Sequence, residues 1–418
     1  MRKIVSQIWN EKGTNVSLFI QLWLVSIVLW FVVDFLYVRY KAYSLPRGFD
    51  ISHCYKVKIG ELPDYSPDYQ SDFDNDSHHQ VFLLQLLDQL RMRSDIEAVS
   101  LSTFAHPYGS IHANGWRCAD TTAQTNFRIR SVTPDFIQVF QYRGERGESS
   151  ERLAEIMRTM PDEAILAGSV SQPQFAHKST SDYIGMDFYQ KNDSLVAHPL
   201  VAAVAPVRYH DFSTGYTPFI LMPLKKEAYQ HPDRLDICLR VKPEHDVDFI
   251  NRFMKDAALY YRNGNLFLAN AVSFRAIGNS YQKDEYLEIR NYLIGIGFLL
   301  FNVFLGLLGI FWFRTQRRRS EIALHKAFGS TRGQVFGRLI LEGLILLTFA
   351  TLPALLIDYN IAHLELTEWD GNAYISASRF LITTGITWLL MALMIIGGIW
   401  FPARKAMKIE PAQALHEE

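Results

Sequence analysis

Four long apolar segments constrain the fold of this chain more than any other feature. Three of them are nearly uncharged over 18–38, 292–313 and 380–401, and the fourth, 339–357, holds one charged residue, Glu342. Each is about as long as a helix that crosses a hydrocarbon layer of roughly 30 Å. None shows the regular polar face of a helix at the surface of a soluble protein. The sequence therefore predicts four transmembrane helices, one and then three, at residues 17–38, 287–313, 339–357 and 379–401.

The residues that flank the first two segments indicate how each segment continues. The first is too long for a signal peptide and ends in Tyr37-Val38-Arg39-Tyr40 instead of a small-residue cleavage pattern, so we interpret it as a retained anchor. Charged residues precede the second segment, and we expect them to continue its helix as a stalk outside the membrane.

The distribution of basic residues predicts the orientation in the membrane. The loop 314–338 carries seven Lys or Arg against one acid, whereas the loop 358–378 carries four acids and no Lys or Arg. Short loops rich in Lys and Arg favour the cytoplasmic side. We therefore expect both termini, the loop 314–338 and the tail 402–418 in the cytoplasm, and the loop 358–378 and residues 39–286 outside it.

The N-terminus has an amphipathic pattern over residues 1–16. Ile4 and Ile8 are four residues apart, and so are Val5 and Trp9, so that each pair shares a helical face. The pattern predicts a helix lying on the cytoplasmic leaflet, and a frayed tail is the alternative.

Residues 39–286 predict a large extracytoplasmic α+β domain. Strand and helix signals recur in two similar cycles, which indicate helices on one face of a sheet. A stretch at about 141–216, between the cycles, is richer in Gly, Pro, Ser and polar residues, and we assign it to an inserted second subdomain. The expected elements are a helix at 81–90, strands at 96–102, 126–132 and 235–241, a helix from near Asp246, and a strand at 265–274.

Three cysteines fall in this external segment: Cys54, Cys118 and Cys238. An odd number allows one disulfide with a spare thiol, and three buried free thiols fit equally well. The sequence does not decide the pairing.

The loop 314–338 contains a short amphipathic helix. Leu324 and Phe328 are four residues apart, which gives the helix an apolar ridge. Gly329 suits the position after a helix, and Thr331 with Gln334 forms a capping-box pattern that begins the next one. The ridge would lie free beneath the membrane, so we expect it to bind a partner.

Motifs of catalysis are absent from the sequence. It contains no Gly-Lys dipeptide and therefore no Walker A motif, no HExxH and no GxSxG. Its histidine pairs lack the spacing of metal ligands, and the acidic stretch 64–76 lacks the glycine and terminal Glu of a calcium loop. We therefore expect no enzymatic activity, no cofactor or metal bound by this chain, and no nucleic-acid partner.

Two motifs resemble the MacB/FtsX-type permeases of ABC transporters. The segment SEIALHKAFGSTRGQVFGRLILEG is similar to the cytoplasmic loop of that family, and the tail FPARKAMKIEPAQALHEE is similar to its ending. The order of one span, a large external domain and three spans agrees as well. His325 stands where the family usually has Arg, and Phe328 where Leu or Met is commoner.

The resemblance implies a non-catalytic permease in a bacterial inner membrane. A separate ATPase subunit would bind ATP and Mg²⁺, and a second permease, identical or paralogous, would complete the transporter. A periplasmic or outer-membrane protein is a further partner that the resemblance allows. The cargo would be a drug, a peptide or a lipoprotein. The alternative is an FtsX-like regulatory protein that controls an external partner without transport.

The resemblance also assigns roles to two groups of residues. The ATPase-coupling residues would be Glu321, Ile322, Ala323, Leu324, Lys326, Ala327, Phe328 and Gly329. The C-terminal motif would comprise Pro402, Ala403, Arg404, Ala406, Pro411, Ala414 and Leu415.

Overall fold

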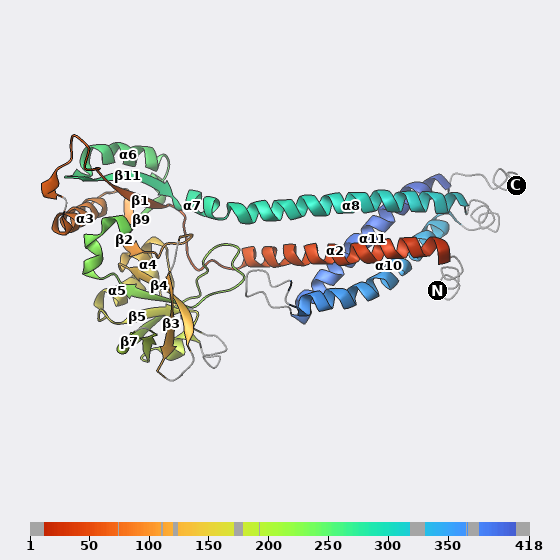
Figure 1. Ribbon diagram of the computed structural model, residues 1–418, viewed down its shortest axis with the longest axis horizontal. Coiled ribbons are helices and arrows are strands. Elements are labelled where there is room, and N and C mark those ends of the chain that lie inside the picture. The colour runs from red at the N-terminus through yellow and green to blue at the C-terminus, as the bar shows by residue number, and fades with distance from the viewer. Residues whose placement is uncertain are drawn as a thin grey trace. The chain divides into compact units, whose positions relative to one another are not determined.

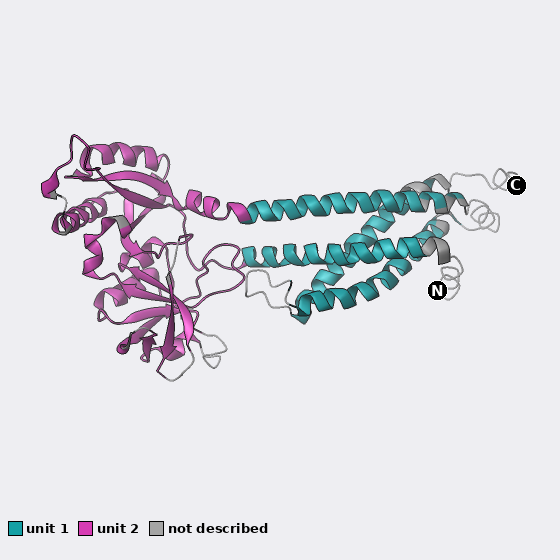
Figure 2. Cartoon of the chain, in the orientation of Figure 1, with its two compact units in different colours: residues 1–44, 285–418 teal, residues 45–284 magenta. Residues whose placement is uncertain are grey.

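The computed structural model forms two compact units, which are described separately (Figure 2). We name residues 1–44 and 285–418 the helical unit, and residues 45–284 the large domain. The structure describes residues 12–73, 75–109, 112–119, 124–170, 179–191, 193–317, 331–364, 366 and 376–406.

Four long helices make up the described part of the helical unit (Figure 1). They are α2 (Lys12–Ser44), α8 (Lys283–Arg317), α10 (Arg332–His363) and α11 (Ala377–Ala406). Each contains a stretch long and apolar enough to cross a membrane: Val16–Ser44, Lys283–Ile310, Phe336–His363 and Ala377–Trp400. One such helix precedes the large domain in the chain and three follow it, which confirms the predicted fold class.

All four helices run beyond the predicted ends of the spans, α8 to Arg317 and α11 to Ala406. Helix α2 continues six residues beyond Val38 to Ser44, and it stops there because Pro46 disfavours helical backbone at Leu45. Helix α10 continues to His363, so the expected loop 358–378 begins inside this helix. No Gly or Pro occurs between Asp358 and His363 to end it sooner. Of the predicted helix at 1–16, residues 1–11 lie outside the described residues.

Helices α2, α10 and α11 pack around a shared apolar core. Leu22 and Leu29 of α2 contribute to it, with Leu347 of α10 and Ile395 of α11. Helix α8 joins this core through Val303 and Leu307.

The glycines of helix α8 differ in how closely other side chains approach them. A Cβ atom at Gly306 would lie 2.7 Å from the side chain of Gln21, so this glycine permits a close approach of α8 to α2. At Gly295, Gly297 and Gly309 an added Cβ would meet nothing within 4 Å.

The large domain is built on two cycles of strand, helix and strand. The first is β1 (Cys54–Glu61), α3 (Asp76–Arg91) and β2 (Ile96–Thr103); the second is β9 (Asp236–Val241), α6 (Phe249–Tyr260) and β11 (Leu266–Ser273). Their strands pair in the antiparallel order β11-β1-β9-β2, which is the ferredoxin-like arrangement. Side chains of both helices enter one core with this sheet, among them Leu83, Leu90 and Phe253. The two helices therefore cover the same face, as predicted.

Between β2 and β9 the chain forms a closed ring of six strands. These are β3 (His112–Cys118), β4 (Thr125–Val132), β5 (Ile165–Gly168), β6 (Asp187–Gln190), β7 (Asp193–Val204) and β8 (Phe219–Pro223). They follow the order β4-β3-β6-β7-β5-β8, and a parallel pairing of β8 with β4 closes the ring. Side chains alternate between two cores: Ile220 belongs to one cluster and its neighbours Phe219 and Leu221 to another.

The ring corrects the predicted bounds of the inserted subdomain, about 141–216. Strands β3 and β4 precede residue 141 and β8 follows residue 216, yet all three belong to the ring. The alternating pattern at 126–132 identifies a strand but does not say which sheet it joins. The pairing of Arg128–Val132 with Phe219–Pro223 decides this.

Short elements complete the large domain. They are α4 (Asp135–Val139), α5 (Ser150–Thr159), α7 (Phe274–Tyr281), β10 (Arg262–Asn263), and 3₁₀ turns at Ser71–Phe73, Thr180–Tyr183, Lys226–Gln230, Pro232–Arg234 and Pro243–His245.

All three cysteines are free and buried. They lie in β1, β3 and β9, and none of them forms a disulfide. Of the two alternatives that the sequence left open, the structure has three buried thiols. Burial raises the pKa of the Cys54 thiol to about 12, and it also raises the pKa of Cys238.

We expect iodoacetamide at pH 8 to leave Cys54 and Cys238 of the native protein unmodified. A thiol with a pKa near 12 has roughly one ten-thousandth of its population as the reactive thiolate at pH 8. Peptide mass spectrometry would measure the modification before and after denaturation, which should expose every thiol. Leu195 is 94% exposed, so a Leu195→Cys variant serves as the reactive control. Fast alkylation of native Cys54 would contradict its burial.

Candidate functional site

The predicted ATPase-coupling residues, 321–329, lie outside the described residues, but the structure describes the helices on either side. Helix α8 ends at Arg317 and α10 begins at Arg332. The side chain of Thr331 accepts a hydrogen bond from the backbone N–H of Gln334 at 3.3 Å, and the Gln334 side chain accepts one from Thr331 at 2.9 Å. The predicted capping box is therefore confirmed, and it places the N-cap of α10 at Thr331, two residues after Gly329.

The C-terminal motif begins inside a helix. Pro402, Ala403, Arg404 and Ala406 belong to the last turns of α11, where Arg404 is exposed. The remaining residues of the motif, Pro411, Ala414 and Leu415, lie outside the described residues.

The start of α10 and the end of α11 lie side by side. The ring centroids of Phe336 and Trp400 are 5.6 Å apart. The chain segment that follows the coupling residues and the segment that carries the C-terminal motif therefore meet at one end of the helical unit. Near this end, Arg338 lies 3.7 Å from the buried Glu342 carboxylate, one helical turn further along α10.

A buried ion pair joins α2 to α11 away from that end. Nε of Arg379 donates a hydrogen bond to Oδ1 of Asp34 at 2.8 Å, and Nη2 donates to Oδ2. The side chain of Asp34 is fully buried and that of Arg379 is 6% exposed. The two-pronged geometry satisfies both carboxylate oxygens, which is what makes the pair tolerable in an apolar bundle.

Aromatic rings from three helices surround the start of α11. Phe380 lies 5.5 Å from Trp30 of α2 and 6.1 Å from Tyr359 of α10, measured between ring centroids. Arg379 was predicted to be the first residue of the last span, and its pairing with Asp34 was not predicted. The sequence does contain one signal for the pair: an acid and a base each lie near the predicted outer end of an apolar segment.

Helix α2 also contacts α8. The guanidinium of Arg39 lies 3.0 Å from the carboxylate of Glu285 and 3.3 Å from that of Glu288. One turn earlier, the ring of Phe35 stacks on that of Tyr292 at 4.2 Å. These contacts hold the beginning of α8 against α2.

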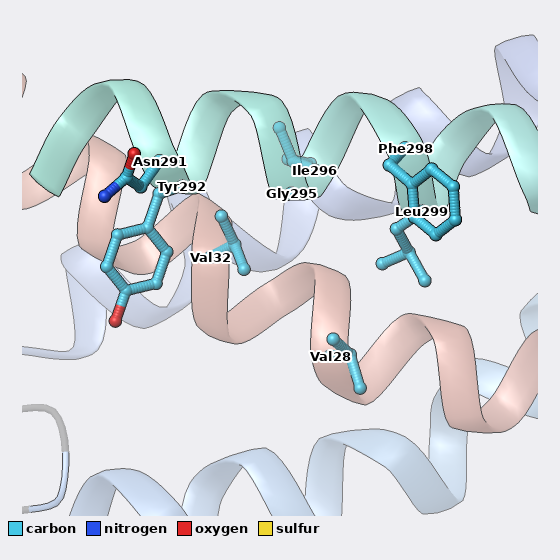
Figure 3. Close-up of a pocket in the computed structure, with 8 residues that line it drawn as sticks. All are labelled: Val28, Val32, Asn291, Tyr292, Gly295, Ile296, Phe298 and Leu299. Carbon is cyan, nitrogen blue, oxygen red and sulfur yellow. The ribbon is translucent and has the colours of Figure 1, made fainter. Parts of the chain in front are cut away.

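Beyond these contacts, α2 and α8 border an apolar groove of about 480 Å³ (Figure 3). Helix α2 contributes Val28 and Val32, and α8 contributes the rest of the lining: Asn291, Tyr292, Gly295, Ile296, Phe298 and Leu299. Only the Asn291 amide and the Tyr292 hydroxyl bring polar atoms to this lining, so the groove suits an apolar chain better than a charged ligand.

A polar network in the large domain ties together residues that lie far apart in the sequence. The buried Asp211 carboxylate accepts hydrogen bonds from Arg47 at 2.8 Å, from Tyr108 at 3.0 Å and from Gln282 at 3.2 Å. Arg208, also buried, donates to the backbone carbonyl of Leu45 at 2.6 Å. The network thus fastens the first residues of the large domain to nearly its last ones. No local sequence pattern indicates it.

A second polar cluster of the large domain contains Lys56, His106 and Asp236. Nζ of Lys56 lies 2.9 Å from Nε2 of His106 and 2.6 Å from the Asp236 carboxylate. The other ring nitrogen of His106 faces the Pro107 carbonyl at 2.8 Å, and it donates there because a carbonyl can only accept. Nε2 must then accept from Lys56, so the ring is neutral. Burial lowers the pKa of His106, in agreement with this geometry.

Neither cluster has the composition of a metal or catalytic centre. No group of three His, Cys, Asp or Glu side chains that could hold a metal ion occurs within the described ranges. The Cys238 thiol is buried and its pKa is raised, so it is not a nucleophile.

The comparisons with known proteins bear on the helical unit. Residues 293–411 match the family model described as FtsX-like permease C-terminal. The uncharacterized ABC transporter permease YknZ of Bacillus subtilis (strain 168) is 25% identical over 212 residues, which are 50% of this chain and 50% of the relative. This chain therefore spans about half the length of that curated relative.

One solved structure matches about half of this chain. It is the extracellular domain of the noncanonic ABC-type transporter YknZ from Gram-positive bacteria, which matches 51% of this chain and 100% of that chain. The identity is 7% and the TM-score is 0.30.

These observations define a multi-pass membrane protein with four candidate spans. Residues 293–411, which include α10, α11 and the predicted coupling residues, form an FtsX-like permease C-terminal domain. The chain is a distant homologue of an ABC transporter permease. The family resemblance drawn from the two sequence motifs is confirmed.

Replacing Asp34 by Asn should destabilise the helical unit by about 3–5 kcal/mol, because it leaves the Arg379 guanidinium buried without a counter-charge. Thermal unfolding of the purified full-length chain in detergent would measure the loss.

The matched control removes both charges. An Asp34→Leu/Arg379→Met variant fills the site with apolar side chains and should recover most of the lost stability. Equal losses in the single and double variants would show that the ion pair is not what stabilises this contact.

Proposed function

We propose that this chain is the non-catalytic permease subunit of an ABC transporter, driven by a separate ATPase subunit that binds ATP and Mg²⁺. The observation that carries the proposal is the match of residues 293–411 to the FtsX-like permease C-terminal family, because both sequence motifs that resemble these permeases begin within it. The amphipathic pattern of residues 321–329 supplies the apolar ridge that such a subunit would bind.

The proposed orientation follows from charge. The loop 314–338 and the tail 402–418 would face the cytoplasm, where the ATPase is, and the large domain would lie outside it. In a bacterium this membrane is the inner membrane.

The helical unit has contacts suited to passing on a movement of the coupling residues. The capping box gives α10 a fixed beginning at Thr331, close to the end of the coupling residues. Helix α10 packs against α2 and α11, the Asp34–Arg379 pair holds α2 to α11, and Arg39 holds α2 to α8. Helices α2 and α8 are the two chain connections to the large domain, so a shift of α10 would be transmitted to both.

Helix α8 offers a surface for the second permease subunit. Of the four candidate spans it is the least covered by the rest of the chain. Its exposed side chains include Phe298, Phe301, Leu305 and Phe313, which form an apolar face. A second copy or a paralogue would bury this face, as two spans that pair in lipid do.

The groove between α2 and α8 favours an amphiphilic cargo. Its lining is apolar and its volume of about 480 Å³ is that of a ligand site. A lipoprotein or a hydrophobic drug would place an apolar chain there, whereas a polar peptide would find few hydrogen-bonding groups.

We expect Leu324→Glu to abolish binding of the ATPase subunit without affecting membrane insertion, because a charge would replace the centre of the apolar ridge. Affinity purification from the native host in mild detergent, followed by mass spectrometry, would measure the stoichiometry of a Walker-motif ATPase. Gln316→Glu adds the same charge at an exposed position outside residues 321–329 and should leave the stoichiometry unchanged.

Unchanged ATPase recovery with Leu324→Glu would contradict the coupling role. Recovery of the ATPase together with an external hydrolase, and without any accumulated or exported compound, would favour the FtsX-like regulatory function over transport.

We expect Gly295→Phe to block the groove without disturbing the backbone, because a Cβ at this position meets nothing within 4 Å. Crosslinking of a photoactivatable fatty acid to the α2 peptide that contains Val28 and Val32 should fall several-fold. Gly309→Phe is the matched control: its Cβ also meets nothing within 4 Å, and Gly309 does not line the groove. Equal crosslinking in both variants would exclude the groove as the site.

A further inference from the structure

Helix α10 carries a second buried acid, Asp358, five residues before the helix ends at His363. It lies within the candidate span Phe336–His363, and the residue is 2% exposed. Its Oδ1 atom has no hydrogen-bond partner, and within the described part of the chain the carboxyl forms no ion pair. This environment differs from that of Asp34, whose two oxygens both accept hydrogen bonds from Arg379.

The charged groups on the helices that pack around α10 are engaged elsewhere. On α11, Arg379 binds Asp34, and on α2, Arg39 binds Glu285 and Glu288. On α10 itself, Arg338 lies beside Glu342, twenty and sixteen residues before Asp358, and the His363 ring stacks on Tyr359. Lys41 and Arg404, the other cations of these helices whose side chains the structure describes, are exposed.

Burying an ionised carboxylate without a counter-charge costs several kcal/mol, which is a large part of the stability of a whole domain. A carboxylic acid that keeps its proton avoids most of this cost. Burial together with the lack of a counter-charge therefore favours the protonated form of Asp358, and burial beside a counter-charge would not.

We propose that Asp358 is a proton-binding site of the helical unit, and that its carboxyl group is a neutral acid while α10 is packed against α2 and α11. Water that reaches the carboxyl would release the proton, so proton occupancy reports the packing of α10. The proton-binding site itself does not depend on the proposed function. A link between proton release and an ATP-driven movement of α10 would depend on the proposed function.

A hydrophobic carbodiimide tests the protonation state directly. Dicyclohexylcarbodiimide reacts with a protonated carboxyl: the acid proton moves to a reagent nitrogen and the carboxyl oxygen bonds to the central carbon. The acyl group then migrates from oxygen to nitrogen, giving a stable N-acylurea that retains the full mass of the reagent. An aspartate in water is only about one-thousandth protonated at pH 7 and reacts little.

The experiment uses the full-length chain in phospholipid nanodiscs at pH 7, with peptide mass spectrometry to locate the adduct. We expect labelling of Asp358 to exceed that of Asp34 by about an order of magnitude, because both carboxylate oxygens of Asp34 are already bound by the Arg379 guanidinium. Asp358→Asn should remove the adduct.

An Arg379→Gln variant checks that the reagent reaches the bundle. It deprives Asp34 of its counter-charge, so Asp34 should also become labelled. Labelled Asp34 in this variant together with unlabelled Asp358 would overturn the proposal, because Asp358 would then be an ionised group with a partner from a second copy or from solvent.

The unfolding temperature of Asp358→Asn gives an independent answer if Arg379→Gln does not fold. A neutral amide in place of a neutral acid should leave the midpoint unchanged. A loss as large as that of Asp34→Asn would show that Asp358 is a charged, paired group and would overturn the proposal.

Discussion

A charged side chain persists inside an apolar helical bundle only where an opposite charge or a proton meets it, and this constraint governs the helical unit. Asp34 and Arg379 satisfy it by a two-pronged hydrogen bond between the first and last spans. Separating the two residues would leave a buried charge without its counter-charge. The pair therefore specifies which faces of α2 and α11 meet. The apolar side chains of the same bundle, such as Leu29 and Ile395, are interchangeable in a way that this pair is not.

In the large domain, strand pairing and a buried polar network join segments that lie far apart in the sequence. Its chain leaves a ferredoxin-like sheet after β2, forms a closed ring of six strands, and returns at β9. Closure leaves the ring without a free strand edge, so the insertion does not expose unpaired backbone groups. The Asp211 network then binds the first and last residues of the domain to a loop that follows the ring strand β7. A buried carboxylate with three donors is a specific fastening, because no apolar substitute could satisfy them.

Predictions from the sequence succeeded where the signal was periodic or local. The apolar segments, the strand–helix–strand cycle that begins at β9 and the capping box at Thr331 all follow from spacing within a few turns of chain, whereas strand β1 was not predicted. The bounds of the inserted subdomain were wrong, because the strand at 126–132 looks the same whichever sheet it joins. Helix ends were also misplaced where no Gly or Pro stopped the chain, as at Asp358. The predicted coupling residues fall outside the described residues and stay a prediction.

The sequence by itself determined the class of protein, because a hydrocarbon layer accepts only long apolar helices and because two short motifs resemble one family of permeases. Tertiary structure decided everything that depends on residues distant in the chain. Asp34 and Arg379 are separated by 345 positions, and no local pattern pairs them. The same holds for the closure of the six-strand ring and for the isolation of Asp358. Charge neutralisation and strand pairing act through space, so only the folded chain shows which partners are present and which are missing.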